Sequence, residues 1–321
     1  MEQEKRAGRG RDAVPRKRKR LKYIAVLPST VTLLNAFCGF MAIVYASRGL
    51  EIFLQVSPLR RANISFLTMS GYMILFAMIA DMLDGQVARW SGAASDFGGQ
   101  LDSLSDCISF GVAPAFLMLK VMEAHLGTET FIDKLRFAAS IKKVFPGWGA
   151  WVVHMAGRWF LFAAIVYVLC AVIRLARFNV ENDTDNAAHN SFAGLPSPAA
   201  AGVVVSLVIF RENFLPRIAG RLPVFCSALM AVSTWLLPFA ALGGGILMVT
   251  RIRYVHAANR LLAGKKTFAT FVVLLFAGLF AVWNIQIALV LGFWGFALSG
   301  LVHYLIDRIR NRKQPEEKGF A

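Results

Sequence analysis

The feature that most constrains this chain is a series of apolar blocks, each nearly free of charged side chains. The blocks are about 20 residues long, the length at which a helix crosses the hydrocarbon core of a bilayer. Over the whole chain, 57% of the residues are hydrophobic and 17% are charged, whereas soluble domains carry about 25% charged residues. In lipid, each spanning segment must satisfy its own backbone hydrogen bonds, which a helix does. The sequence therefore predicts an all-α, polytopic membrane bundle.

About eight transmembrane helices are expected from the lengths of these blocks. They cover residues 26–45, 64–82, 101–122, 160–175, 198–210, 223–249, 268–283 and 285–306. The fifth is short for a membrane span, and the last two are divided only around Asn284. Lys and Arg concentrate in the N-terminal tail, between the sixth and seventh spans and after the eighth. The positive-inside rule then places both ends of the chain in the cytoplasm.

The basic residues outside these spans explain the formal net charge of +16. In a soluble protein such a charge suggests nucleic acid, but the basic run 16–20 lies beside a predicted membrane span. Attraction of the tail to anionic headgroups is the favoured interpretation, and a nucleic-acid-binding arm is the alternative. The exterior loop 123–157 contains four further basic residues and is expected to lie along the interface as an amphipathic helix. These residues are Lys134, Arg136, Lys142 and Lys143.

Four aspartates stand at the border of two predicted spans, where carboxylates are costly and rare. Asp81 and Asp84 end the second span, and Asp102 and Asp106 open the third. Spacings of three and four residues place each pair on one face of its helix. A glycine-containing turn joins the two spans, so we expect a hairpin that brings all four carboxylates together at the membrane surface.

Carboxylates packed this closely repel one another unless some are protonated or a cation neutralises them. Ligand sets made only of oxygen favour hard divalent cations such as Mg²⁺ or Mn²⁺. Two such ions bridge a pyrophosphate and neutralise the charge that develops on it. Arg89 adds a fixed positive charge within reach of phosphate. Acids that snorkel from helix ends to water are the alternative interpretation of the cluster.

The segment matches the pattern DxxDGxxAR-x8-GxxxDxxxD at every specified position, and it resembles the signature of the CDP-alcohol phosphotransferase family. The matching positions are Asp81, Asp84, Gly85, Ala88, Arg89, Gly98, Asp102 and Asp106. The resemblance implies a site for two metal ions made by the four aspartates, with Asp106 also acting as the general base. It further implies a CDP-lipid site at Gly85, Ala88, Arg89 and Gly98, and a six-helix core to which this chain adds two helices.

Three other segments resemble the bacterial membrane-bound phosphatidylserine synthases within that family. Residues 28–39 are similar to their PNxxTxxNxxxG opening, except that Ser29 replaces the usual Asn, and Thr32 and Asn35 are assigned to the CDP-lipid site. Residues 174–179 and 192–198 are similar to their RLARFN and FxGLPxPxA segments. Asn35 as a helix-packing amide is the alternative at that position.

Arg174 and Arg177 lie three residues apart and can hold an anion from one helical face. The carboxylate of an acceptor or the phosphate of a lipid both qualify as that anion. Anchoring at the cytoplasmic surface by the positive-inside rule is the alternative. The segment 194–196 is equally consistent with a plain turn before a helix.

The resemblance implies that the chain transfers the phosphatidyl group of CDP-diacylglycerol to L-serine and releases CMP. The same chemistry with glycerol 3-phosphate or inositol phosphate is an alternative, and a membrane transporter is a more distant one. The expected partners are CDP-diacylglycerol, L-serine and the bilayer, with a homodimer left open and no nucleic acid. The expected location is the bacterial inner membrane, with the site facing the cytoplasm.

The predicted organisation is one membrane domain with tails. Residues 1–22 form a basic cytoplasmic tail, and residues 23–249 form the catalytic transmembrane core. Residues 250–306 contain a cytoplasmic loop and the two additional helices, and residues 307–321 form a second cytoplasmic tail.

Overall fold

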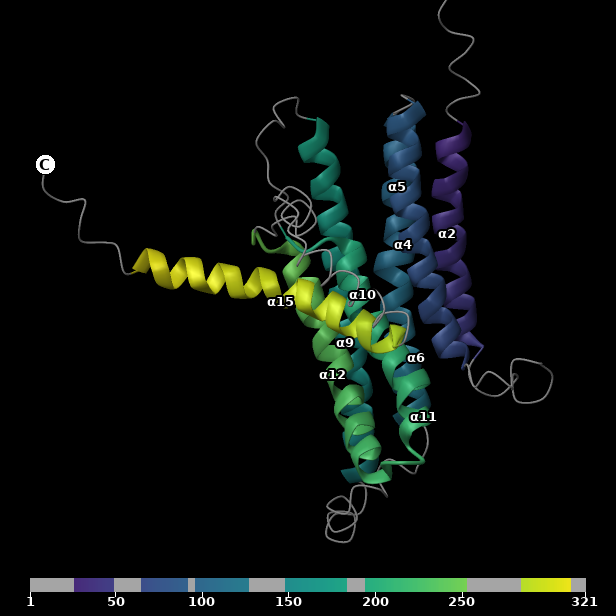
Figure 1. The fold of residues 1–321 in the computed structure, drawn as a ribbon, viewed down its shortest axis with the longest axis vertical. Coiled ribbons are helices and arrows are strands. Elements are labelled where there is room, and N and C mark those ends of the chain that lie inside the picture. Colours follow the sequence, from purple (N-terminus) through teal and green to yellow (C-terminus); the bar gives the residue numbers. More distant parts are fainter. Residues whose placement is uncertain are drawn as a thin grey trace, which may run out of the picture.

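A computed structural model describes residues 26–48, 65–91, 96–126, 148–183, 194–252 and 284–312. Within these ranges the secondary structure is helical, and no strand occurs in them. The elements are α2 (Val26–Ser47), α4 (Phe66–Ser91), α5 (Asp96–Asp106), η2 (Cys107–Val112), α6 (Ala113–Leu126), α9 (Trp148–Asp183), α10 (Ser197–Ile209), η4 (Phe210–Phe214), α11 (Leu215–Ile218), α12 (Pro223–Val249) and α15 (Ile285–Arg312). The predicted all-α bundle is confirmed (Figure 1).

Seven helical segments of the described part of the chain are long and apolar enough to cross a membrane. Six of them correspond to the first six predicted spans, and the seventh, in α15, begins at the predicted residue, Ile285. The predicted span 268–283, the tail 1–22 and the basic residues of the exterior loop lie outside the described residues. A total of eight spans and a shared side for the two ends therefore stay predictions.

The third predicted span is one continuous rod made of three parts. The α-helix α5 passes into the π-helical segment η2 and then into the α-helix α6, and the candidate membrane span within them covers Phe97–Ala124. A π-helical segment contains one or more hydrogen bonds from residue i to residue i+5 and so widens the helix locally. The sequence predicted the rod but not this change of helix type.

The fifth span is longer than predicted, and its predicted end at Phe210 is wrong. It runs over Ser197–Ile218, through the π-helical segment η4. The charged residues that follow Phe210 have partners inside the protein: Arg211 Nε donates to Thr234 Oγ1 at 3.0 Å, and the guanidinium also pairs with Glu212. Because buried charges persist when they are paired, the helix continues past them.

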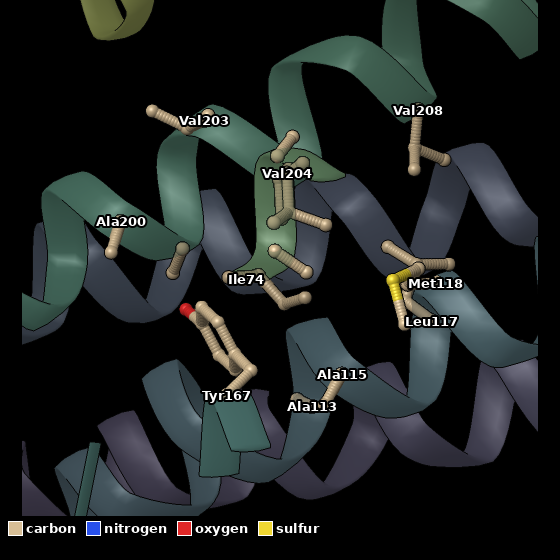
Figure 2. Packing of buried hydrophobic residues seen from close by; sticks show 14 of the residues in the cluster. Ile74, Ala113, Ala115, Leu117, Met118, Tyr167, Ala200, Val203, Val204 and Val208 are labelled. Atoms are coloured by element: carbon tan, nitrogen blue, oxygen red, sulfur yellow. The ribbon is translucent and has the colours of Figure 1, made fainter. Parts of the chain in front are cut away.

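The core lies where α2, α4, α6, α9, α10 and α12 meet, and it is rich in small side chains. Figure 2 shows Ala113, Ala115 and Ala200 beside larger residues such as Tyr167 and Met118. Small residues let membrane helices approach closely. Close van der Waals packing then holds the helices together, because lipid provides no hydrophobic driving force between them.

Helix α15 packs mainly on α10. Trp294 Nε1 donates to the Val203 carbonyl oxygen at 3.2 Å, and Gln286 Nε2 donates to Asn213 Oδ1 at 3.5 Å. The ring of Phe293 lies so close to Gly202 that a Cβ there would stand 2.2 Å from it. The C-terminal part of α15 extends away from the other helices (Figure 1), so its contacts with the core come from its N-terminal half.

Candidate active site

The predicted hairpin brings carboxylates of α4 and α5 together. Asp81, Asp102 and Asp106 each offer a carboxylate oxygen, and these oxygens all lie within 4.8 Å of one another. Asp84 lies one turn beyond Asp81 and is only 6% exposed, and Asp106 is 9% exposed. The structure thus brings three of the four predicted carboxylates into one compact group, with the fourth, Asp84, beside it.

Two oxygens of this acidic cluster lack a partner among the described residues. Asp84 Oδ2 and Asp102 Oδ1 are buried and accept no hydrogen bond there. Leaving a carboxylate oxygen buried and unpaired is costly, and a hard cation supplies the missing interaction with oxygen ligands alone. The donor set and its close spacing therefore fit a divalent metal ion.

Helix α2 provides the polar side chains that contact the aspartates. Asn35 Nδ2 donates to Asp106 Oδ1 at 3.1 Å, and the side chain of Thr32 hydrogen-bonds the Asp84 carboxylate. Asn35 is fully buried, so its amide does more than fill space between helices: it orients one of the acids. Both residues were predicted to belong to the site, and the structure brings both to it.

Arg174 of α9 faces the same acids. Its guanidinium lies close enough to Asp81 and Asp106 to interact with both electrostatically. Nη1 also donates to Ser197 Oγ at 2.7 Å, at the first residue of α10. A residue that only anchored the helix at the membrane surface would point to water, so the inward position favours a role in the site. Arg177, three residues further on, is partly buried, and its role stays a prediction.

The turn that precedes α10 fixes the position of Ser197. Gly194 has φ of 96°, a conformation that side chains other than glycine rarely adopt. Its N–H donates to the Ile252 carbonyl oxygen at 2.9 Å, and a Cβ at Gly194 would stand 2.4 Å from the Met248 carbonyl oxygen. A plain turn before a helix was one of two interpretations of this segment, but its attachment to the end of α12 could not be predicted from the sequence.

The remaining predicted positions lie on the same two helices. Gly85 follows Asp84 in α4 and donates its backbone N–H to that carboxylate. Gly98 lies in the first turn of α5 and is partly buried. Ala88 and Arg89 belong to α4, but their side chains lie outside what the structure describes. Contact of these residues with a nucleotide stays a prediction.

Several contacts around the site are made by serine and tyrosine side chains to which the sequence analysis gave no role in the site. Ser103 Oγ donates to Asn179 Oδ1 at 2.9 Å and so ties α5 to α9 beside Asp102. Ser109 Oγ donates to the Asn35 carbonyl oxygen at 2.9 Å, and Tyr167 Oη donates to the Phe110 carbonyl oxygen at 2.9 Å. These partners are 57 to 76 residues apart in the chain, so no local sequence pattern predicts these hydrogen bonds.

Comparison with curated proteins finds relatives that are named CDP-diacylglycerol–serine O-phosphatidyltransferase. The relative from Methanocaldococcus jannaschii is 27% identical over 241 residues, which cover 75% of this chain and 79% of the relative. The relative from Mycobacterium leprae is 30% identical over 241 residues, which cover 74% of this chain and 60% of the relative. The relative from Helicobacter pylori is 28% identical over 229 residues, which cover 71% of each chain. The match thus spans less than two thirds of the mycobacterial protein.

Comparison with protein families matches residues 25–242 to CDP-alcohol phosphatidyltransferase. The matched region begins just before α2 and ends within α12, so it contains all four aspartates, Asn35 and Arg174, and it excludes α15. The helical architecture, the aspartate cluster and this match agree, and the chain belongs to the CDP-alcohol phosphatidyltransferase family.

Proposed function

We propose that this protein transfers the phosphatidyl group of CDP-diacylglycerol to the hydroxyl of L-serine, which yields phosphatidylserine and CMP. The observation that carries the proposal is the cluster of Asp81, Asp102 and Asp106, whose oxygens lie within 4.8 Å of one another and which Arg174 faces. Serine as the acceptor is supported by the names of the relatives.

The proposed cofactor is a divalent cation, Mg²⁺ or Mn²⁺, bound as two ions by Asp81, Asp84, Asp102 and Asp106. When bound, such ions neutralise the pyrophosphate of the donor and the negative charge that develops on it. The unpaired oxygens of Asp84 and Asp102 support this assignment because they are already buried without a partner among the described residues.

Asp106 is the proposed general base. Its carboxylate removes the proton from the serine hydroxyl while that oxygen attacks the phosphorus on the lipid side of the pyrophosphate. The new P–O bond forms as the bond from this phosphorus to the bridging oxygen breaks, and CMP leaves with the bonding electrons. The hydrogen bond from Asn35 to Asp106 Oδ1 holds the carboxylate in a fixed orientation.

Arg174 is the proposed anion-binding residue, and Arg177 is assigned to the same role. The guanidinium of Arg174 is positioned beside the acids by its hydrogen bond to Ser197, where it meets the carboxylate of serine or the phosphate of the donor. The CDP moiety is proposed to contact Gly85, Ala88, Arg89 and Gly98 on α4 and α5 and Thr32 and Asn35 on α2.

The protein is a multi-pass membrane protein, and we place it in the bacterial inner membrane with the site at the cytoplasmic face. This placement rests on the distribution of Lys and Arg along the sequence. It gives the site access to soluble serine and releases CMP into the same compartment.

A panel of acceptors tests the proposal. The purified protein receives CDP-diacylglycerol with serine, glycerol 3-phosphate, inositol phosphate or inositol, and the lipid product is identified by mass. Phosphatidylserine is expected to dominate by at least about a hundredfold, because the other acceptors leave charged groups of the site unpaired. A different main product would assign the chain to another acceptor and leave the aspartate chemistry in place.

A further inference from the structure

We propose that the π-helical segment η2 positions the Asp106 carboxylate, and that Ser109 and Tyr167 are the positioning residues through which α2 and α9 hold it. This inference rests on the proposed role of Asp106 as the base. Neither residue belongs to the family pattern or touches the carboxylate itself, so their contribution has to act through the backbone of η2 and through Asn35.

The segment η2 begins at the residue after Asp106. Asp106 itself has α-helical torsion angles, φ −62° and ψ −39°, and at the far end of the segment the Ala113 N–H reaches back five residues to the Ile108 carbonyl oxygen. A π-helical turn shifts the residues on its two sides relative to one another. The direction of Asp106 relative to α6 is therefore set by how η2 is held.

Helix α2 holds η2 through a chain of two hydrogen bonds. Ser109 Oγ donates to the backbone carbonyl oxygen of Asn35, and the side-chain amide of Asn35 donates to Asp106. Ser109 and Asp106 lie three residues apart, so the backbone between them connects the two ends of this hydrogen-bonded chain and closes it into a ring. Gly39, one turn after Asn35, makes room for this contact, since a Cβ there would stand 2.8 Å from Ser109 Cα.

Helix α9 holds η2 from another direction. Tyr167 is fully buried in the core (Figure 2), and its hydroxyl donates to the Phe110 carbonyl oxygen inside η2. Arg174 lies seven residues further along α9, on the same helical face. The hydroxyl of Tyr167 thus fixes the base relative to the proposed anion-binding residue, and a small displacement between such groups costs up to about a hundredfold in rate.

Replacing Tyr167 by Phe tests the inference because it removes only the hydroxyl and keeps the ring. We expect kcat to fall about tenfold, while the KM values for serine and CDP-diacylglycerol and the affinity for Mn²⁺, measured by electron paramagnetic resonance, change less than about twofold. Ser109→Ala is expected to act in the same direction. Tyr72→Phe is the control, since Tyr72 packs against the same core and makes no hydrogen bond to a residue that the structure describes; it is expected to leave kcat unchanged.

A double-mutant cycle separates positioning from a general structural role. In an Asp106→Asn background, Tyr167→Phe is expected to have little further effect on the residual turnover, followed with radiolabelled serine. The same tenfold loss in both backgrounds, or a kcat of Tyr167→Phe and Ser109→Ala equal to that of Tyr72→Phe, would overturn the inference. Near-normal turnover of Asp106→Asn alone would instead refute the proposed base, a result that the cycle reports separately.

Discussion

Asp106 is the residue on which most of the contacts of the site converge. Asn35 hydrogen-bonds it, Asp81 and Asp102 lie beside it, and Arg174 faces it. Each of these neighbours comes from α2, α4, α5 or α9, so the position of one carboxylate depends on the packing of four helices. The sequence predicted which aspartates meet, because their spacing on two neighbouring helices is a local pattern. It did not predict the hydrogen bonds from other helices that hold these carboxylates in place.

Replacing Asp106 or Asp102 by Asn is expected to reduce turnover at least about a hundredfold without unfolding the protein. The amide has nearly the shape of the carboxylate but is a poor base and a poor metal ligand, and loss of a general base costs about a hundredfold or more. Glu123→Gln is the matched control, because Glu123 is exposed and pairs with Lys120 away from the cluster. Turnover is measured as CMP release in detergent. Near-normal activity of Asp106→Asn would remove Asp106 from the role of base.

Arg174→Lys is expected to raise the KM for serine or for CDP-diacylglycerol about tenfold. Arg174 donates to Ser197 and keeps further N–H groups of its planar guanidinium for a carboxylate or phosphate. Lys keeps the positive charge but cannot bind such an anion with two parallel hydrogen bonds. Arg158→Lys, at an exposed position of the same helix, is expected to leave both KM values unchanged. Equal kinetics of the two variants would show that the guanidinium of Arg174 binds neither substrate.

At the scale of elements, the contact of α2 with η2 decides the geometry of the site. Gly39→Ala places a Cβ 2.3 Å from Ser109 Oγ and 2.8 Å from Ser109 Cα, and the second contact involves backbone. We therefore expect the two elements to move apart, with a loss of stability of about 1–3 kcal/mol and a clear loss of activity.

Gly243→Ala is the control for this prediction, because a Cβ at Gly243 of α12 meets nothing within 4 Å. Replacing a helical glycine by alanine at an open position is expected to be neutral or slightly stabilising. Thermal melting in detergent and CMP release measure both effects. If Gly39→Ala behaved like Gly243→Ala, the close packing of α2 on η2 would be wrong.

The elements also show where prediction from sequence ends. The boundaries of α12 agree with the predicted span 223–249, because its apolar block is bounded by charged residues on both sides. The predicted fifth span ended at Phe210, just before the charged residues Arg211 and Glu212, whereas the partner of Arg211, Thr234, lies 23 residues away in α12. The π-helical segment η2 has no local signature either, because it is held by Tyr167 and Asn35 from other helices.

At the scale of the whole molecule, the matched region 25–242 contains the complete aspartate cluster, and α15 is an addition that packs on α10. Because α15 contributes no residue to the cluster, we expect it to stabilise the fold without taking part in the chemistry. Gly202→Ala tests this by forcing the Phe293 ring away from α10. The melting temperature is expected to fall while turnover of the folded fraction stays within about twofold of the original. Loss of turnover without loss of stability would contradict a purely stabilising role of α15.

The most direct test of metal-assisted phosphatidyl transfer is to measure phosphatidylserine formation in the presence and absence of a divalent cation. Purified protein in detergent receives CDP-diacylglycerol and serine, first with excess chelator and then with Mg²⁺ or Mn²⁺ restored, and CMP and lipid product are both quantified. We expect no turnover in chelator and, after the cation is restored, equal amounts of CMP and phosphatidylserine. Full turnover in chelator, or CMP release without phosphatidylserine, would contradict it.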